Sequence, residues 1–199
     1  MRRKHVIGLT GNIATGKSTV VRMLEELGAE AIDGDAIAHQ LMGPGSPLAG
    51  EIRAAFGEQA VNSDGSINRP ELGKVVFSDP VMLQRLEEIV WPTVLARKRE
   101  AINQPGPDVL ILDAIKLFES GMAEECDEVW VVTSPREVQI ARIIARNKVD
   151  RAEAERRIDA QPPQSEKVAR ADLVLDNSGS LGDLERQVQE AWRRLVGAG

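Results

Sequence analysis

Short runs of aliphatic residues alternate with longer amphipathic stretches along this chain. Five apolar runs are each long enough for one buried strand, at residues 6–9, 29–32, 109–113, 128–133 and 173–175. Between them, apolar residues recur every three or four positions, as in helices packed on one face. Strands that alternate with helices pair in parallel. The pattern therefore predicts an α/β fold, with a five-stranded parallel sheet that has helices on both faces.

Polar residues mark where several of these helices begin. Ser134-Pro135 has the order of an N-cap followed by proline at the first helical position. Asp150 with Glu153, and Ser180 with Asp183, have the spacing of capping boxes. We therefore expect helices to start at these three places.

The stretch between the second and third strands is too long for a simple crossover. It has helical periodicity, with turn clusters at 43–47 and 62–65 and a return to the sheet at 104–107. A helix is predicted to start at Asp79-Pro80 and to break at Trp91-Pro92, before a further helix. The sequence thus predicts an inserted helical subdomain at 36–103.

The first apolar run leads into a phosphate-binding loop. The residues from Gly11 to Ser18 fit the pattern of glycine, four free positions and Gly-Lys-Ser. Glycines let backbone N–H groups surround phosphate oxygens, and the helix that follows directs its positive end to the same anion. Lys17 is predicted to reach the β- and γ-phosphates, and the Ser18 hydroxyl to ligate Mg²⁺. The predicted ATP-binding set is Thr10, Gly11, Asn12, Ile13, Ala14, Thr15, Gly16, Lys17, Ser18 and Thr19.

Composition narrows the class of protein further. The chain has 199 residues, which suits one α/β domain, and a net charge of −6. Such a charge argues against a general binder of nucleic acid or of anionic membranes. The single cysteine, Cys126, excludes an intrachain disulfide. The basic start passes directly into the phosphate loop, so we expect no signal peptide, no membrane span and a cytoplasmic location.

Three aspartates follow predicted strands at the sheet edge that carries the phosphate loop. Asp35 is the candidate base that orients an acceptor hydroxyl and takes its proton, although it equally suits the N-cap of the next helix. Asp113 ends the third strand and is the candidate that helps to hold Mg²⁺, directly or through water. Asp33 is a weaker candidate for the same metal.

Basic residues cluster after the fourth strand. Arg142 and Arg146 are four residues apart and share a helix face, where they are expected to stabilise phosphate charge. For Arg151, Arg156 and Arg157, surface ion pairs with neighbouring glutamates are the favoured interpretation.

Several motifs, taken in order and spacing, resemble the dephospho-coenzyme A kinase family almost from end to end. They comprise Leu9-Thr10-Gly11, residues 32–38, Leu117-Phe118-Glu119, residues 139–142, residues 157–161, Ala171-Asp172 and residues 176–179. The resemblance implies the three-layer P-loop NTPase fold of nucleoside kinases. It divides the single kinase domain into a core at 1–35, 104–145 and 168–199, an acceptor subdomain at 36–103 and a lid at 146–167.

The resemblance also implies a reaction, in which ATP phosphorylates the ribose 3′-hydroxyl of dephospho-coenzyme A with Mg²⁺ as cofactor. Asp35, Lys17 and Arg142 are then catalytic, and Asn177 and Gly179 lie near the adenine. The expected acceptor-binding residues are Asp35, His39, Lys116 and Glu119.

Three departures from the family pattern keep alternatives open. Asn12 and Ala14 stand where the family usually has glycine, Trp91-Pro92 where it has His-Pro, and residues 115–117 where it has Pro-Leu-Leu. The last two departures concern the acceptor side, where Lys116 points either to an acceptor phosphate or to solvent. The alternatives are another small-molecule or nucleotide kinase of this fold, and a non-catalytic nucleotide switch.

Overall fold

The computed structural model describes residues 4–197, and for residues 35, 38, 98 and 101 it describes the backbone alone. The chain forms two compact units. One comprises residues 33–104, and the other is built from the segments before and after them.

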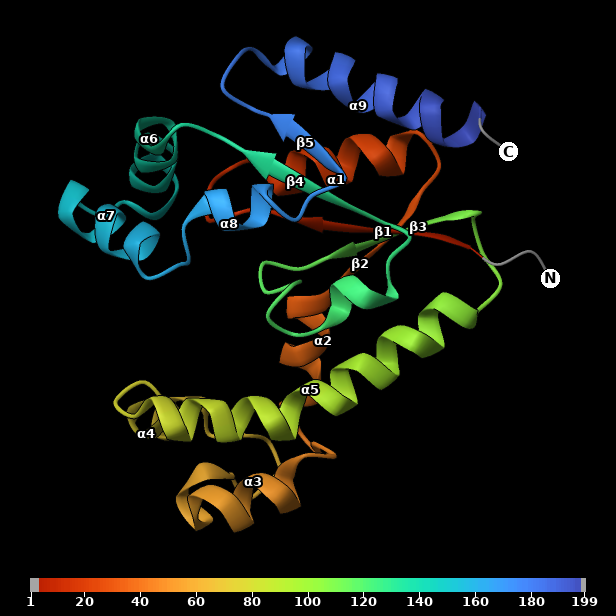
Figure 1. Ribbon diagram of the computed structural model, residues 1–199. Helices are drawn as coiled ribbons and strands as arrows, with labels where there is room; N and C mark the ends of the chain where they lie inside the picture. Colours follow the sequence, from red (N-terminus) through yellow and green to blue (C-terminus); the bar gives the residue numbers. More distant parts are fainter. Residues whose placement is uncertain (1–3, 198–199) are drawn as a thin grey trace. The chain divides into compact units, whose positions relative to one another are not determined.

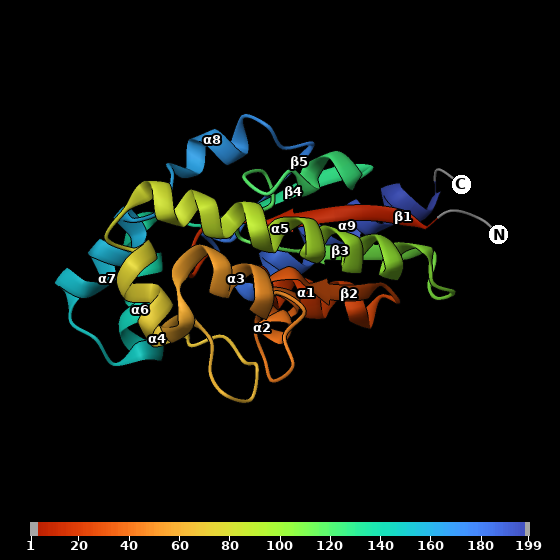
Figure 2. The same cartoon turned by 90° about the horizontal axis from the view of Figure 1, so that it is seen from below.

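The larger unit is built on a five-stranded parallel sheet. Its strands are β1 (His5–Thr10), β2 (Glu30–Asp33), β3 (Val109–Asp113), β4 (Glu128–Thr133) and β5 (Leu173–Asp176). They lie in the order β2-β3-β1-β4-β5, which can be followed across Figure 2. In the register, Ile7 pairs with Ile111 and Leu9 with Trp130. The predicted sheet is confirmed, with strand bounds that differ by at most one residue at either end.

Helices α1 (Lys17–Glu26) and α9 (Leu181–Gly197) pack together on one face of this sheet (Figure 1). The core between them contains Leu24 of α1 and Leu184 of α9, both fully buried, and Trp130 of β4. Burying a large apolar side chain contributes about 1.5–3 kcal/mol. The apolar face of each helix therefore fixes it against the strands, and α1 begins where the phosphate loop ends.

The opposite face of the sheet is covered by the chain that follows β3. Leu117 and Met122 are fully buried there, and the short 3-10 helix η2 (Met122–Glu125) contacts β1. Gly8 makes this contact possible, because a Cβ at Gly8 would lie 2.7 Å from Leu117 Cδ2 and 2.8 Å from Cys126 Sγ. Cys126 is half-buried, and its thiol donates to the Met122 carbonyl at 3.3 Å.

Along the chain, three further helices connect β4 to β5. They are α6 (Arg136–Asn147), α7 (Arg151–Asp159) and α8 (Gln164–Val168). The prediction that Ser134 is the N-cap of α6 is wrong, since Pro135 occupies that position and Ser134 donates its hydroxyl to the Asn177 carbonyl at 3.2 Å. The cap at Asp150 is confirmed by its bond from the Glu153 N–H at 2.7 Å.

The capping box before α9 is confirmed in both directions. The Ser180 N–H donates to Asp183 Oδ2 at 2.9 Å, and the Asp183 N–H donates to Ser180 Oγ at 3.2 Å. The Ser180 hydroxyl also donates to Asp183 Oδ2, at 2.6 Å, and this bond is the largest cause that lowers the pKa of Asp183 to about 2, followed by the bond from the Ser180 N–H.

The helical unit has its own core. The unit consists of α2 (Gly34–Leu41), α3 (Ala49–Phe56), the 3-10 helix η1 (Glu58–Ala60), α4 (Arg69–Val76) and α5 (Pro80–Asn103). Ile52 of α3, Leu72 of α4 and Val94 of α5 meet in this core.

The predicted break at Trp91-Pro92 is wrong, because α5 continues through Pro92. Proline removes one helical hydrogen bond and bends a helix without necessarily ending it. Figure 1 shows α5 changing direction part-way along its length. Trp91 and Val94 pack against the other helices of the unit, and this packing holds both halves of α5.

Within residues 4–197, no helix combines the length and the hydrophobicity that crossing a bilayer requires.

Substituting Gly8→Ala should destabilise the protein by about 1–3 kcal/mol, because the added methyl overlaps Leu117 and Cys126. Urea unfolding measures this free energy. In a Leu117→Ala background the penalty of Gly8→Ala should fall, since the space is then open. An equal penalty in both backgrounds would contradict this account of the contact.

Candidate active site

The phosphate loop connects β1 to α1 at the carboxyl edge of the sheet. Gly16 is the N-cap of α1 and has a φ of 100°, a conformation that favours glycine. A Cβ at Gly16 would lie 2.1 Å from Asn177 Nδ2, so the close approach of the β5–α9 loop also requires glycine. Ala14 has a φ of 62°, which explains why glycine suits this position better.

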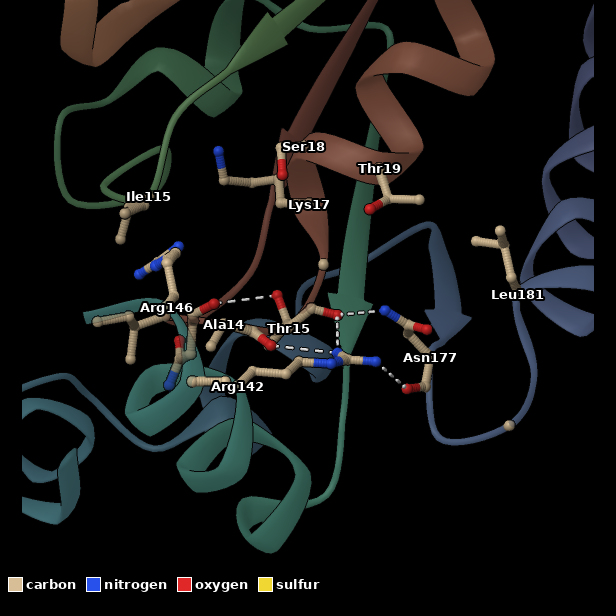
Figure 3. Close-up of a pocket in the computed structure, with 15 residues that line it drawn as sticks. Ala14, Thr15, Lys17, Ser18, Thr19, Ile115, Arg142, Arg146, Asn177 and Leu181 are labelled. Carbon is tan, nitrogen blue, oxygen red and sulfur yellow. Dashed lines mark hydrogen bonds between the residues drawn. The ribbon is translucent and has the colours of Figure 1, made fainter. Parts of the chain in front are cut away.

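Two side chains hold the loop by its carbonyl groups. Arg142 Nη1 donates to the carbonyls of Ala14 at 3.2 Å and Thr15 at 3.1 Å, while its Nη2 donates to the Asn177 carbonyl at 3.4 Å. Asn177 Nδ2 donates to the Thr15 carbonyl at 2.8 Å. Figure 3 shows this network, which joins α6 and the β5–α9 loop to the phosphate loop.

A cavity of about 730 Å³ opens beside the loop, a size that suits a nucleotide. Ile115 and Arg146 lie at one end of it and Leu181 and Asn177 at the other (Figure 3). Among the described residues, its lining includes three cations and no carboxylate. The lining consists of Asn12, Ile13, Ala14, Thr15, Gly16, Lys17, Ser18, Thr19, Ile115, Arg142, Ala145, Arg146, Asn177, Gly179 and Leu181. This charge pattern suits a polyanion.

Lys17 forms an ion pair with Asp113, the last residue of β3. Both side chains are mostly buried, with 16% and 13% exposed, so the pair lies at the base of the site. Ser18 is exposed on the first turn of α1 and lines the cavity. No group of three or more histidine, cysteine, aspartate or glutamate side chains gathers as a metal cage in the described part of the chain. The donors that suit a divalent cation here are thus one hydroxyl and one carboxylate, a small set that phosphate oxygens usually complete.

The two aspartates at the junction of β2 and α2 differ in their roles at the helix start. Asp33 Oδ1 accepts from the Ala36 N–H at 3.0 Å, so Asp33 caps α2. The alternative that Asp35 is the N-cap is therefore wrong, because Asp35 already lies within the first turn of α2. The position of the Asp35 side chain lies outside what the structure describes.

The remaining predicted residues lie in varied surroundings. Thr10 is fully buried, and its hydroxyl donates to the Ile115 carbonyl at 3.0 Å, so it is not part of the cavity lining. Lys116 and Glu119 are exposed after β3, and His39 is exposed on α2.

The arginines of α7 are engaged in surface ion pairs, as predicted. Arg151 donates to both oxygens of Glu137 at 2.7 and 3.0 Å. This contact lowers the pKa of Glu137, the hydrogen bond from Arg151 being the largest cause. Arg157 and Arg156 both bind Glu153 and lower the pKa of that carboxyl in the same way. Exposed pairs contribute about 0–1 kcal/mol each. The pair of Arg151 with Glu137 joins α7 to α6, whereas Glu153 lies on α7 itself.

Sequence reasoning missed several residues at the site. Ala145 and Leu181 line the cavity, and Gln161 Oε1 accepts from the Ile13 N–H at 2.7 Å. In the sequence, Gln161 stands out only as a member of the 157–161 motif, because a hydrogen bond between residues 148 positions apart leaves no local pattern.

Comparison with known proteins identifies the family. A family model described as dephospho-CoA kinase matches residues 5–183. The chain belongs to the dephospho-CoA kinase family. The predicted resemblance, the kinase class and the fold are thereby confirmed, and neither alternative receives support.

The chain is also similar over nearly its whole length to individual relatives and solved structures. A dephospho-CoA kinase of Symbiobacterium thermophilum is 48% identical, over 96% of this chain and 82% of the relative. A crystal structure from Thermus thermophilus has a TM-score of 0.83 and 35% identity, over 97% and 98% of the two chains. The dephospho-CoA kinase of Campylobacter jejuni has a TM-score of 0.69 and 27% identity, over 96% and 97%.

Substituting Gly16→Ala in this kinase should weaken the binding of a nucleoside triphosphate by at least about tenfold, since each displaced hydrogen-bonding group costs about 1–3 kcal/mol. The added methyl would displace Asn177 from the loop, and alanine is strained at this φ. Titration calorimetry measures the affinity. Gly182→Ala is the control, because its Cβ has only Ser180 Oγ nearby, at 3.9 Å. Affinity within threefold of the unsubstituted protein would refute the requirement for glycine.

Proposed function

We propose that this kinase transfers the γ-phosphoryl group of ATP, bound with Mg²⁺, to the ribose 3′-hydroxyl of dephospho-coenzyme A. The observation that carries this proposal is the cation-lined cavity along a phosphate loop whose carbonyls are tied back by Arg142 and Asn177. Family membership supports the choice of acceptor.

ATP would lie along the loop with its phosphates toward Lys17 and its adenine toward Asn177 and Gly179, all of which line the cavity. Lys17 would exchange its partner Asp113 for phosphate oxygens, keeping a countercharge throughout. The freed Asp113 carboxylate and the Ser18 hydroxyl would hold Mg²⁺. The ion, when bound, neutralises charge that develops on the phosphate oxygens.

We assign the catalytic base to Asp35, which lies in the first turn of α2, two residues after the cap Asp33. Its carboxylate would take the proton of the acceptor hydroxyl while that oxygen bonds to the γ-phosphorus. The bond from phosphorus to the β–γ bridging oxygen breaks, and ADP leaves. Arg142 and Arg146 would stabilise the charge on the transferring group.

Two further assignments belong to the same proposal. The helical unit would bind the acceptor, with His39 as a candidate contact, together with Lys116 and Glu119 after β3. Residues 146–167 would form the lid that excludes water. The cytoplasmic location and the absence of a nucleic-acid partner rest on the sequence and stay predictions.

An acceptor panel tests the function directly. ATP consumption is measured with dephospho-coenzyme A, shikimate, gluconate and nucleoside monophosphates, and mass spectrometry with phosphorus NMR locates the added phosphate. We expect dephospho-coenzyme A to be preferred, with phosphorylation at the 3′-oxygen. Preference for a nucleoside monophosphate, or nucleotide binding without transfer to any acceptor, would overturn the proposal.

Substituting Asp35→Asn should lower kcat by about 10²–10⁴-fold while the affinity for ATP is retained, because the amide cannot take a proton. Substituting Lys17→Ala should lower both, because phosphate charge loses its counter-ion. Asp64→Asn is the control, since that carboxylate bonds to Ser66 in a turn of the helical unit. Unchanged turnover of the Asp35→Asn variant would show that another group is the base.

A further inference from the structure

The chain between α7 and β5 is bound to the phosphate loop. We call residues 161–170 the strap; it includes the whole of α8. At its first end, Gln161 Oε1 accepts from the Ile13 N–H at 2.7 Å. Asn12 Nδ2 donates to the carbonyl of Pro162 at 3.0 Å. Two adjacent bonds therefore hold the phosphate loop at Asn12 and Ile13, whereas the bonds from Arg142 and Asn177 hold it at Ala14 and Thr15.

The other end of the strap is bound to the chain that follows β3. Lys167 donates from its ammonium group to the Ile115 carbonyl and lies 3.8 Å from the Glu119 carboxylate. The guanidinium of Arg170 lies 4.1 Å from the centre of the Phe118 ring. Because the Ile115 carbonyl also accepts from the Thr10 hydroxyl, Lys167 binds at the point where this segment meets the end of β1.

Lys167 is an unusual side chain for a surface helix, since only 4% of it is exposed. Burying an ammonium group is costly unless it is hydrogen-bonded and paired. Buried ionic groups add little net stability, and their best-attested use is to specify one arrangement of neighbouring elements. Lys167 donates to the backbone of Ile115, a residue that lines the nucleotide cavity.

We propose that Gln161 and Lys167 are positioning residues, which together hold the phosphate loop and the segment 115–119 at the separation that ATP requires. Neither residue contacts ATP in this proposal. Gln161 acts through the Ile13 N–H and Lys167 through the Ile115 carbonyl, and the strap forms the base of the lid. The inference deepens the proposed function, because it rests on ATP binding in this cavity.

The Gln161→Ala substitution tests the first end. It leaves the Ile13 N–H without its acceptor, and we expect binding of a non-hydrolysable ATP analogue to weaken about tenfold. The amide of Ile13 should also exchange with deuterium at least about tenfold faster. Gln164→Ala is the matched control, because Gln164 Oε1 accepts only from Gln139, at 3.3 Å, among the bonds observed and does not reach the loop. It should leave both quantities unchanged.

The Lys167→Met substitution tests the second end, since methionine keeps the length of the side chain and lacks the ammonium group. We expect about tenfold weaker binding of the analogue. Lys167→Arg should restore most of it, because the guanidinium donates to the same carbonyl. Lys4→Met is the matched control, as Lys4 is equally buried, pairs with Glu30 at 2.8 Å and precedes β1 at the opposite edge of the sheet. It should lower the melting temperature without changing the affinity.

The double variant Gln161→Ala, Lys167→Met distinguishes one strap from two separate contacts. If both ends act as a unit, the double variant should bind only slightly less tightly than either single variant. Full additivity would overturn the shared role. Affinity within twofold of the unsubstituted protein in both single variants, with melting temperatures lowered as in Lys4→Met, would show that the contacts are structural only.

The exchange of the Ile13 amide is measured without nucleotide. The exchange rate therefore tests the role of Gln161 independently of nucleotide binding. If the unsubstituted protein does not bind the analogue, the proposed function is overturned, but the test of Gln161 still stands. If the Ile13 amide exchanges at the same rate in the Gln161→Ala variant, the proposal that Gln161 positions the phosphate loop is wrong.

Discussion

The site depends on the orientation of a few peptide units in the phosphate loop. In a peptide unit the C=O and the N–H point in opposite directions, so a side chain that binds the carbonyls from one side turns the amides to the other. Arg142 and Asn177 bind the carbonyls of Ala14 and Thr15. Their bonds therefore direct the N–H groups of these peptide units to the opposite side, which is the arrangement that an anion-binding loop requires.

Positive charge is concentrated at the same site. The chain is acidic overall, with a net charge of −6, yet Lys17, Arg142 and Arg146 line one cavity without a carboxylate among the described lining residues. Several arginines elsewhere pair with surface carboxylates, as Arg151 does with Glu137. Low local dielectric and convergence, more than the number of cations, make this cavity suited to phosphate.

The division into two units separates two requirements. The sheet unit needs a rigid edge, and it obtains one from fully buried residues such as Leu9, Leu24 and Trp130. The helical unit has its own core around Ile52. It carries the departure from the family pattern at Trp91, and it contains no part of the phosphate loop. In the function proposed above, the nucleotide site rests on the first core, and the part of acceptor binding assigned to the helical unit rests on the second.

Local sequence determined the elements of this protein and the type of chemistry. Apolar runs predicted all five strands, and the spacing from Gly11 to Ser18 predicted the phosphate loop, because strand burial and the glycine pattern are properties of neighbouring residues. Only the tertiary structure decided that Asp33 caps α2, that Ser134 serves the Asn177 loop and that α5 continues through Pro92. In each case two local interactions competed, and contacts from distant segments or the exact helix start selected one. The ion pair of Lys17 and Asp113 spans 96 residues, and the bond from Ile13 to Gln161 spans 148, distances over which no periodicity in the chain carries information.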